Sequence, residues 1–142
     1  MLEIAAELKR EGARLKRSVL FTFFTGEERG KFGSKYFVWH PPVDPKSIVA
    51  DLNVDVVHAI VPLKQVAAIG LDESDLGEAA QRAARSQNLT ADAERESHPY
   101  PSAFDGNSDQ GSFALAGIPA IKLMVGFPGE MGALIEKYRK TV

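Results

Sequence analysis

The chain has 142 residues, of which 44% are hydrophobic and 25% are charged, and its formal net charge is -2. This length and composition predict one soluble globular domain with a hydrophobic core. The small net charge provides no broad basic surface, so nucleic acid is disfavoured as a partner. The chain has no cysteine, which excludes disulfides and thiolate ligands. Any metal must therefore be held by carboxylate, imidazole or water.

The chain begins with a predicted amphipathic helix that ends near Gly12. Met1, Ile4, Ala5 and Leu8 share one helical face. The helix starts without an N-cap, from which we expect further sequence upstream. No apolar stretch reaches the roughly 20 residues of a membrane span, and no signal-peptide core is present.

Residues 18–28 are the stretch most suggestive of a functional site. Residues 19–24 are apolar except for Thr22 and do not alternate with polar side chains, which predicts a strand covered on both faces at the centre of a parallel sheet. Gly26 ends this run and Glu27 and Glu28 follow, at the end of the strand where open α/β sheets bind ligands. Alternatively, the two glutamates only begin the next helix, where the dipole favours acidic side chains.

A second predicted strand also leads to a carboxylate. Residues 29–40 have the apolar spacing of a short helix, which Pro41 and Pro42 stop. Residues 48–55 then form a mostly apolar run with Asp55 at its end. Two strands that end in carboxylates predict a shared acidic site.

The remaining elements alternate between strands and helices. They are expected to be a strand at 65–69, a helix capped by Ser74 that ends near Asn88, a loop at 90–106 with a short edge strand near 93–96, a short helix from Ser108 to Ala116, a strand at 120–125 and a helix at 131–138. This alternation predicts an α/β fold, a three-layer α/β/α domain with a mostly parallel twisted sheet.

Sequence motifs narrow the chemistry. The sequence contains neither the His-Glu-x-x-His motif of zinc proteases nor the Gly-x-Ser-x-Gly motif of serine hydrolases. The glycine-rich motifs of phosphate-binding loops and of dinucleotide-binding folds are also absent from it. His40, His58 and His98 have no ligand spacing, so each is interpreted as structural or exposed. An acidic cluster can bind metal or act as an acid and base pair on sugars. Trp39 is the only tryptophan for a sugar platform, which favours metal.

Several segments together resemble the zinc exopeptidases of peptidase family M28, which include bacterial aminopeptidases and glutamate carboxypeptidase-like enzymes. The matching residues are 17–33, with the paired glutamates, 33–37, 50–55, 108–110, Phe113 and 117–120. The resemblance extends over nearly the whole chain.

The resemblance implies a site with two zinc ions that are bridged by one aspartate and a water or hydroxide. It implies that Glu27 is the general base, that Glu28 is a ligand of one zinc and that Asp55 is a ligand of the other. The family's other ligands, two histidines and the bridging aspartate, have no counterpart here. We therefore expect a partial peptidase catalytic domain that is incomplete at both ends and binds zinc weakly or not at all.

Ser108 and Asp109 are expected near the same edge of the sheet as Glu28, because a helix N-terminus there can bind a peptide substrate. Simple helix capping by Ser108 is the alternative. The leading function is hydrolysis of an amino-terminal peptide bond. A glutaminyl cyclase and a non-catalytic binding domain of the same fold remain alternatives, and the family resemblance suits a secreted or periplasmic protein as well as a cytoplasmic one.

Overall fold

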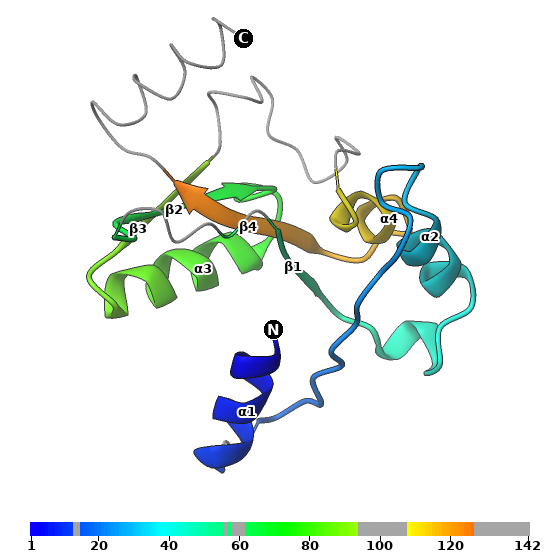
Figure 1. Cartoon of the computed structure of the whole chain (residues 1–142), viewed down its shortest axis with the longest axis horizontal. Helices are drawn as coiled ribbons and strands as arrows, with labels where there is room; N and C mark the ends of the chain where they lie inside the picture. The colour runs from blue at the N-terminus through cyan, green and yellow to red at the C-terminus, as the bar shows by residue number, and fades with distance from the viewer. Residues whose placement is uncertain (13–14, 56, 58–61, 94–107, 127–142) are drawn as a thin grey trace, which may run out of the picture.

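The structure is a computed structural model that describes the chain except for residues 13–14, 56, 58–61, 94–107 and 127–142. It contains both helices and strands (Figure 1). In chain order they are α1 (Leu2–Arg10), α2 (Phe32–Trp39), the 3-10 helix η1 (Pro45–Ser47), β1 (Asp51–Val54), β2 (Gln65–Ile69), α3 (Asp75–Ser86), β3 (Thr90–Ala93), α4 (Gln110–Leu115) and β4 (Ala120–Gly126). The fold is therefore mixed α/β.

The described strands form one four-stranded sheet in the order β1-β4-β2-β3. The outer pairs β1 with β4 and β2 with β3 are parallel, whereas β2 and β4 are antiparallel. Since the antiparallel pair lies in the middle, the sheet is mixed. Register places Asn53 of β1 directly beside Lys122 of β4, so these two side chains lie on the same face of the sheet.

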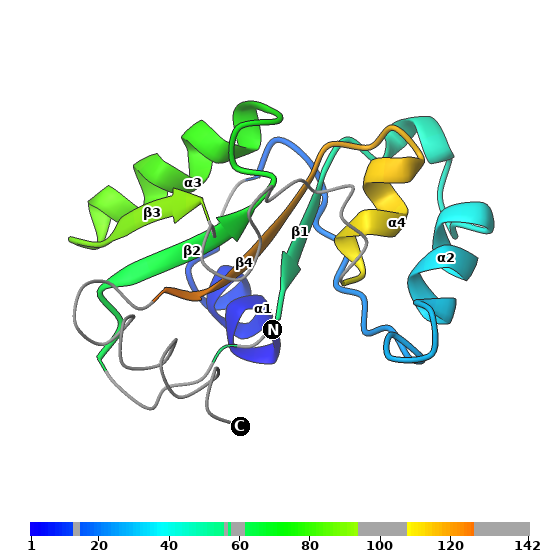
Figure 2. The ribbon, with the colours of Figure 1, turned by 90° about the horizontal axis from the view of Figure 1, so that it is seen from above.

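Two hydrophobic clusters hold the helices against the sheet. The first lies under α3 and is formed by Ala68, Leu71 and Ile121 with Leu76 and Ala80 of the helix packed against them. The second joins α2, α4 and the start of β4 through Phe113, Ala114 and Ala120, with Phe24 and Phe37 packed against them. Figure 2 shows α3 alongside β2 and β3, and α4 between β1 and α2. The second cluster is the one that positions the candidate site.

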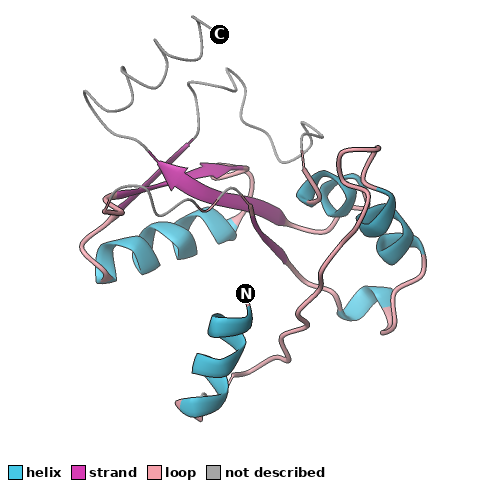
Figure 3. Cartoon of the chain, viewed as in Figure 1, coloured by secondary structure: helices cyan, strands magenta, loops and turns pink. Residues whose placement is uncertain are grey.

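The predicted central strand at residues 19–24 is wrong. Residues 18–26 form no strand and run as an extended loop between α1 and α2 (Figure 3). Val19 and Phe23 are 53% and 67% exposed. At the end of the run, the Phe24 ring contacts Phe37 and Phe113 with centroids 5.6 and 6.0 Å apart. A continuous apolar run favours burial but does not specify which strand it pairs with.

The predicted strands at 48–55, 65–69 and 120–125 are present, as are the helix capped by Ser74 and the short helix predicted at 108–116, with differences at their ends. The short edge strand was expected near 93–96, but β3 occupies Thr90–Ala93, and residues 94–96 lie outside the described part. The predicted helix at 131–138 also lies outside it. α1 has no buried residue, and Ala5 and Leu8 on its apolar face are only partly buried. Within the described ranges no helix is long and apolar enough to cross a membrane.

Candidate functional site

Glu27 and Glu28 lie in a tight turn before α2. Gly26 has φ +70°, a backbone conformation that glycine adopts without strain. The turn is closed by the amide of Arg29, which donates to the Gly26 carbonyl at 3.3 Å, and that of Gly30, which donates to the Glu27 carbonyl at 3.0 Å. Since α2 begins only at Phe32, the alternative that the glutamates form the first turn of this helix is wrong. Glu27 is partly buried and Glu28 is exposed.

β1 presents three polar side chains on one face. Asp51 and Asn53 are less exposed than Leu52 and Val54, which alternate with them. Asp55 continues the same face one residue beyond the strand, where its amide still donates to a β4 carbonyl, that of Leu123, at 3.3 Å. The predicted delivery of Asp55 at the end of this strand is therefore confirmed.

The start of α4 meets this face of β1. Ser108 is only 2% exposed, and its hydroxyl donates to Asp55 Oδ2 at 3.1 Å. Asn53 Nδ2 donates to both Ser108 Oγ and Gln110 Oε1 at 3.1 Å. The N-cap of α4 is Asp109, which makes no capping bond through its side chain. The Ser108 hydroxyl thus orients Asp55, and helix capping by Ser108 is not seen.

Lys122 completes the network from β4. Its ammonium lies 2.8 Å from Asp55 Oδ2, with 8% of the Lys122 side chain and 43% of the Asp55 side chain exposed. A buried lysine is rare unless its charge is paired. The same Asp55 oxygen therefore meets both the Ser108 hydroxyl and this ammonium.

The site carboxylates influence one another's ionisation. Burial raises the pKa of Glu27 above its usual value, with the charges of Glu28, Asp109 and Asp55 acting in the same direction and Lys122 opposing them. Burial and the neighbouring Asp109 raise the pKa of Asp51 to about 7. The structure thus brings Glu27, Asp55 and Asp109 close enough to interact electrostatically.

Three buried polar atoms have no hydrogen-bond partner among the described residues: Asp51 Oδ2, Asp109 Oδ1 and Gln110 Nε2. They come from the same two elements, β1 and the start of α4. Buried polar atoms are normally paired, so this corner of the site has capacity for a further hydrogen-bonding group.

A protein zinc site generally needs at least three converging ligands. In the part of the chain that is described, no three His, Cys, Asp or Glu side chains converge as a metal site would require. Asp55 Oδ2 already meets an ammonium and a hydroxyl. The described carboxylates therefore do not form a zinc site by themselves.

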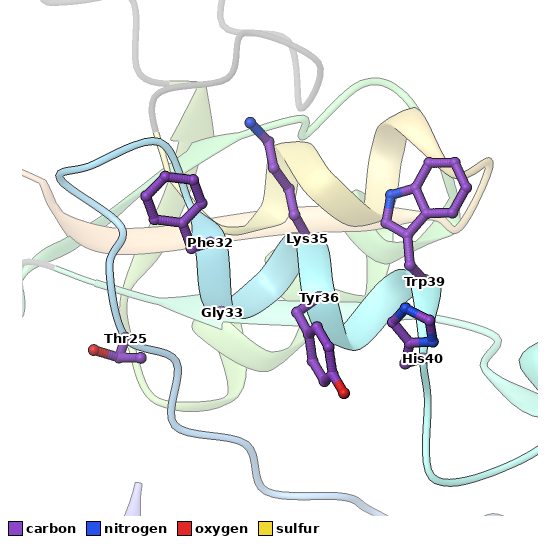
Figure 4. A pocket seen from close by; sticks show the side chains of 7 residues that line it. All are labelled: Thr25, Phe32, Gly33, Lys35, Tyr36, Trp39 and His40. Atoms are coloured by element: carbon purple, nitrogen blue, oxygen red, sulfur yellow. The ribbon is translucent and has the colours of Figure 1, made fainter.

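A shallow hollow of about 590 Å³ lies elsewhere, over α2. Figure 4 shows its lining residues, which are Thr25, Phe32, Gly33, Lys35, Tyr36, Trp39 and His40. The rings of Tyr36 and His40 contact each other with centroids 4.8 Å apart. None of the site carboxylates lines this hollow. His40 is exposed, as interpreted from the sequence. His58 and His98 lie outside the described residues.

Comparison with known proteins identifies the family. Residues 1–141 match the family model of peptidase family M28. The chain belongs to this family. Its M28 fold is also similar to the crystal structure of BSAP, a zinc aminopeptidase from Bacillus subtilis, with a TM-score of 0.53 and 21% sequence identity. That match covers 76% of this chain but 26% of the Bacillus chain. A search of curated proteins gave no match.

Sequence reasoning missed Lys122, Asp51 and the bridging role of Asn53 in the candidate site. One signal was present for Lys122, which is the only charged residue in the apolar run 120–126. A lysine in a buried strand requires a partner of opposite charge, and Asp55, just beyond the end of β1, is that partner. No local pattern identified Asp51, because its burial depends on α4.

Proposed function

We propose that this chain provides part of the active site of a zinc-dependent exopeptidase, most naturally an aminopeptidase acting on peptide substrates. Membership of the M28 family supports the reaction class. The observation that carries the proposal is that the charges of Asp55 and Asp109, which come from two other segments, both help to raise the pKa of Glu27. The proposed architecture around them is the three-layer α/β/α arrangement.

In this proposal Glu28 and Asp55 each contribute a ligand to one of two zinc ions whose other ligands come from outside the described residues. Zinc, when bound, would activate a water molecule and polarise the substrate carbonyl. Glu27 accepts the proton as general base. Its raised pKa suits this role, because a base is most effective when its pKa approaches the working pH.

Ser108 and Asp109 have a proposed role in positioning the substrate. Asp109 Oδ1 supports this role, since it is buried, has no hydrogen-bond partner within the described ranges and can accept a hydrogen bond from a substrate amine or amide. Asp55 depends on the Ser108 hydroxyl for its orientation.

The test uses a polypeptide that carries residues 1–142 together with segments supplying two histidines and the bridging aspartate. We expect it to bind zinc and to hydrolyse amino-acid anilides rather than to cyclise glutaminyl peptides. Glu27→Gln should lower turnover by at least about 100-fold, since general base catalysis contributes this much, while zinc content stays unchanged. The exposed Glu11→Gln variant is the control. Full activity of Glu27→Gln would refute the role of Glu27.

A non-catalytic domain of this fold is the second candidate. The observation that favours it is the Lys122–Asp55 ion pair, because a cation of the chain itself already neutralises a carboxylate that the first proposal assigns to metal. Absence of zinc binding and of anilide hydrolysis in the extended polypeptide would support this candidate.

A further inference from the structure

We propose that Asn53 is a positioning residue for Asp55 and that it acts through the hydroxyl of Ser108. The side-chain amide of Asn53 donates to this hydroxyl, which in turn donates to Asp55. The inference rests on the proposed function for one point only, the assignment of Asp55 to the active site. It adds a residue that orients this carboxylate and that the proposed function does not use.

The ion pair of Asp55 fixes the direction of these hydrogen bonds. Lys122 Nζ lies 2.8 Å from Asp55 Oδ2, and a carboxylate that is paired with an ammonium is ionised and can only accept. Ser108 Oγ lies 3.1 Å from the same oxygen, so the single hydrogen of this hydroxyl is used there. Ser108 therefore has only lone pairs left for Asn53, and the group of Asn53 that faces it must be the NH₂ group.

Gln110 holds Asn53 in the same orientation. Asn53 Nδ2 lies 3.1 Å from Ser108 Oγ and 3.1 Å from Gln110 Oε1. Its two hydrogens thus serve two acceptors at the start of α4. A hydroxyl that accepts a hydrogen bond donates a stronger one, because successive hydrogen bonds polarise each other. The amide of Asn53 therefore holds the Ser108 hydroxyl in place and strengthens its bond to Asp55.

Little water reaches this network. Ser108 is 2% exposed and Gln110 is fully buried. Asn53 lies on the face of β1 that leads to Asp55, and the parallel register places it beside Lys122 of β4. Since water cannot readily replace the amide of Asn53 at a buried hydroxyl, its loss has to change the network.

A purely structural role is the alternative, in which Asn53 only fastens the start of α4 to β1. Both roles predict that the folded chain loses stability when Asn53 is replaced. Only the positioning role predicts that the replacement alters Asp55 and that the hydroxyl of Ser108 transmits this effect. The test therefore measures Asp55 itself.

The carboxyl carbon of Asp55 reports on its surroundings in ¹³C NMR spectra of the labelled 142-residue chain. We expect its signal to move in Asn53→Leu, which keeps the size of the side chain and removes its donors, and in Ser108→Ala. In the double variant Asn53→Leu should add less than about half of the shift that it causes alone, because the transmitting hydroxyl is gone. Gln87→Leu removes a side-chain amide at an exposed position after α3 and should leave the signal in place.

Two results would overturn the inference: an Asp55 signal that Asn53→Leu does not move, or a shift of the same size in the Ser108→Ala background. If Asn53→Leu does not fold, Asn53→Ala gives the same comparison with a smaller side chain. The unmodified chain offers an independent test, since NOE contacts should join the side-chain amide hydrogens of Asn53 to Ser108 and to Gln110. Amide hydrogens that make no such contact with Ser108 would contradict the direction of donation.

Turnover separates this inference from the proposed function. In the extended polypeptide that tests the proposed function, Asn53→Leu should lower turnover by about tenfold or more, as the loss of a group that orients an active-site residue does. If the extended polypeptide is inactive although the Asp55 signal behaves as expected, the proposed function fails and the positioning role stands. If the polypeptide is active and the Asp55 signal does not depend on Asn53, only the positioning role is wrong.

Discussion

The carboxyl group of Asp51 lies at the first residue of β1, next to Asp109 and away from solvent. Its pKa is raised to about 7, first by burial and then by the negative charge of Asp109. Its Oδ2 has no hydrogen-bond partner among the described residues. Both observations indicate that the folded chain holds Asp51 in its neutral form below neutral pH.

The pH dependence of stability follows from the direction of this shift. Between about pH 4 and pH 7 the unfolded chain releases the Asp51 proton and the folded chain keeps it, so this group lowers stability as pH rises. Asp51→Asn removes the effect. As the pH rises from 4 to 8, we expect the free energy of unfolding of the variant to increase by about 2–4 kcal/mol relative to that of the unmodified chain. Urea unfolding at both pH values measures the gain.

The exposed Glu11→Gln variant provides the control for Asp51→Asn, because it makes the same carboxyl-to-amide change in solvent. Its stability relative to the unmodified chain should not vary with pH to a comparable extent. If the difference in unfolding free energy between Asp51→Asn and the unmodified chain is also constant from about pH 4 to pH 8, Asp51 ionises normally in the folded chain.

For some residues of the candidate site, but not for others, the sequence could predict that they belong to it. Glu27 and Asp55 were predicted because each follows a run of apolar residues, which is a local signal. Lys122 was not predicted, because its pairing depends on the register between β1 and β4, whose residues are far apart in the chain. The sequence therefore indicated the acidic groups and not the cation that balances one of them.

α3 shows how one glycine fixes the packing of an element. A Cβ on Gly77 would lie 1.7 Å from the carbonyl oxygen of Leu71, far inside contact distance. Ser74 begins the helix by accepting a hydrogen bond from the amide of Leu76 at 3.4 Å. The chain therefore turns so tightly before α3 that its own backbone covers the first turn.

Gly77→Ala should destabilise the chain even though alanine is the better helix former. The clash is with backbone, which cannot rotate away, so we expect a loss of about 3 kcal/mol or more in the free energy of unfolding. Ala83→Gly, at an exposed position of the same helix, should cost only about 1 kcal/mol. Thermal unfolding of both variants tests the comparison, and a neutral or stabilising Gly77→Ala would show that the helix can shift.

The elements that were predicted well are those whose limits have local causes. β2 coincides with an apolar run that Gly70 ends, and α3 begins after a capping serine. Gly117 follows α4 and has φ +78°. Residues 19–24 failed because a strand needs a neighbouring strand as well as an apolar composition. Neither edge of the four-stranded sheet pairs with them in the structure.

At the scale of the whole molecule, β1 pairs on one side only, with β4, in the described part of the chain. Leu52 on this edge strand is 57% exposed, and Phe23 in the loop between α1 and α2 is 67% exposed. An open strand edge beside exposed apolar side chains favours association between molecules.

We therefore expect the 142-residue chain to associate as its concentration rises, as measured by sedimentation velocity. Phe23→Lys should reduce this association, because it places a charge within the exposed apolar loop. Gln87→Lys adds the same charge at an exposed position after α3 and should have little effect. A chain that stays monomeric at all concentrations, or equal behaviour of the two variants, would contradict this expectation.

The position of β4 also determines the order in which the molecule can be assembled on the ribosome. β4 comes last of the described strands in the chain, yet it lies between β1 and β2. The nascent chain can pair β2 with β3 early, but β1 cannot pair with β4 until residues 120–126 have emerged. The ring contact of Phe24 with Phe113 likewise cannot form until Phe113 has been synthesised. The carboxylate group at Asp55 therefore acquires its Lys122 partner only after nearly all of the described chain has been synthesised.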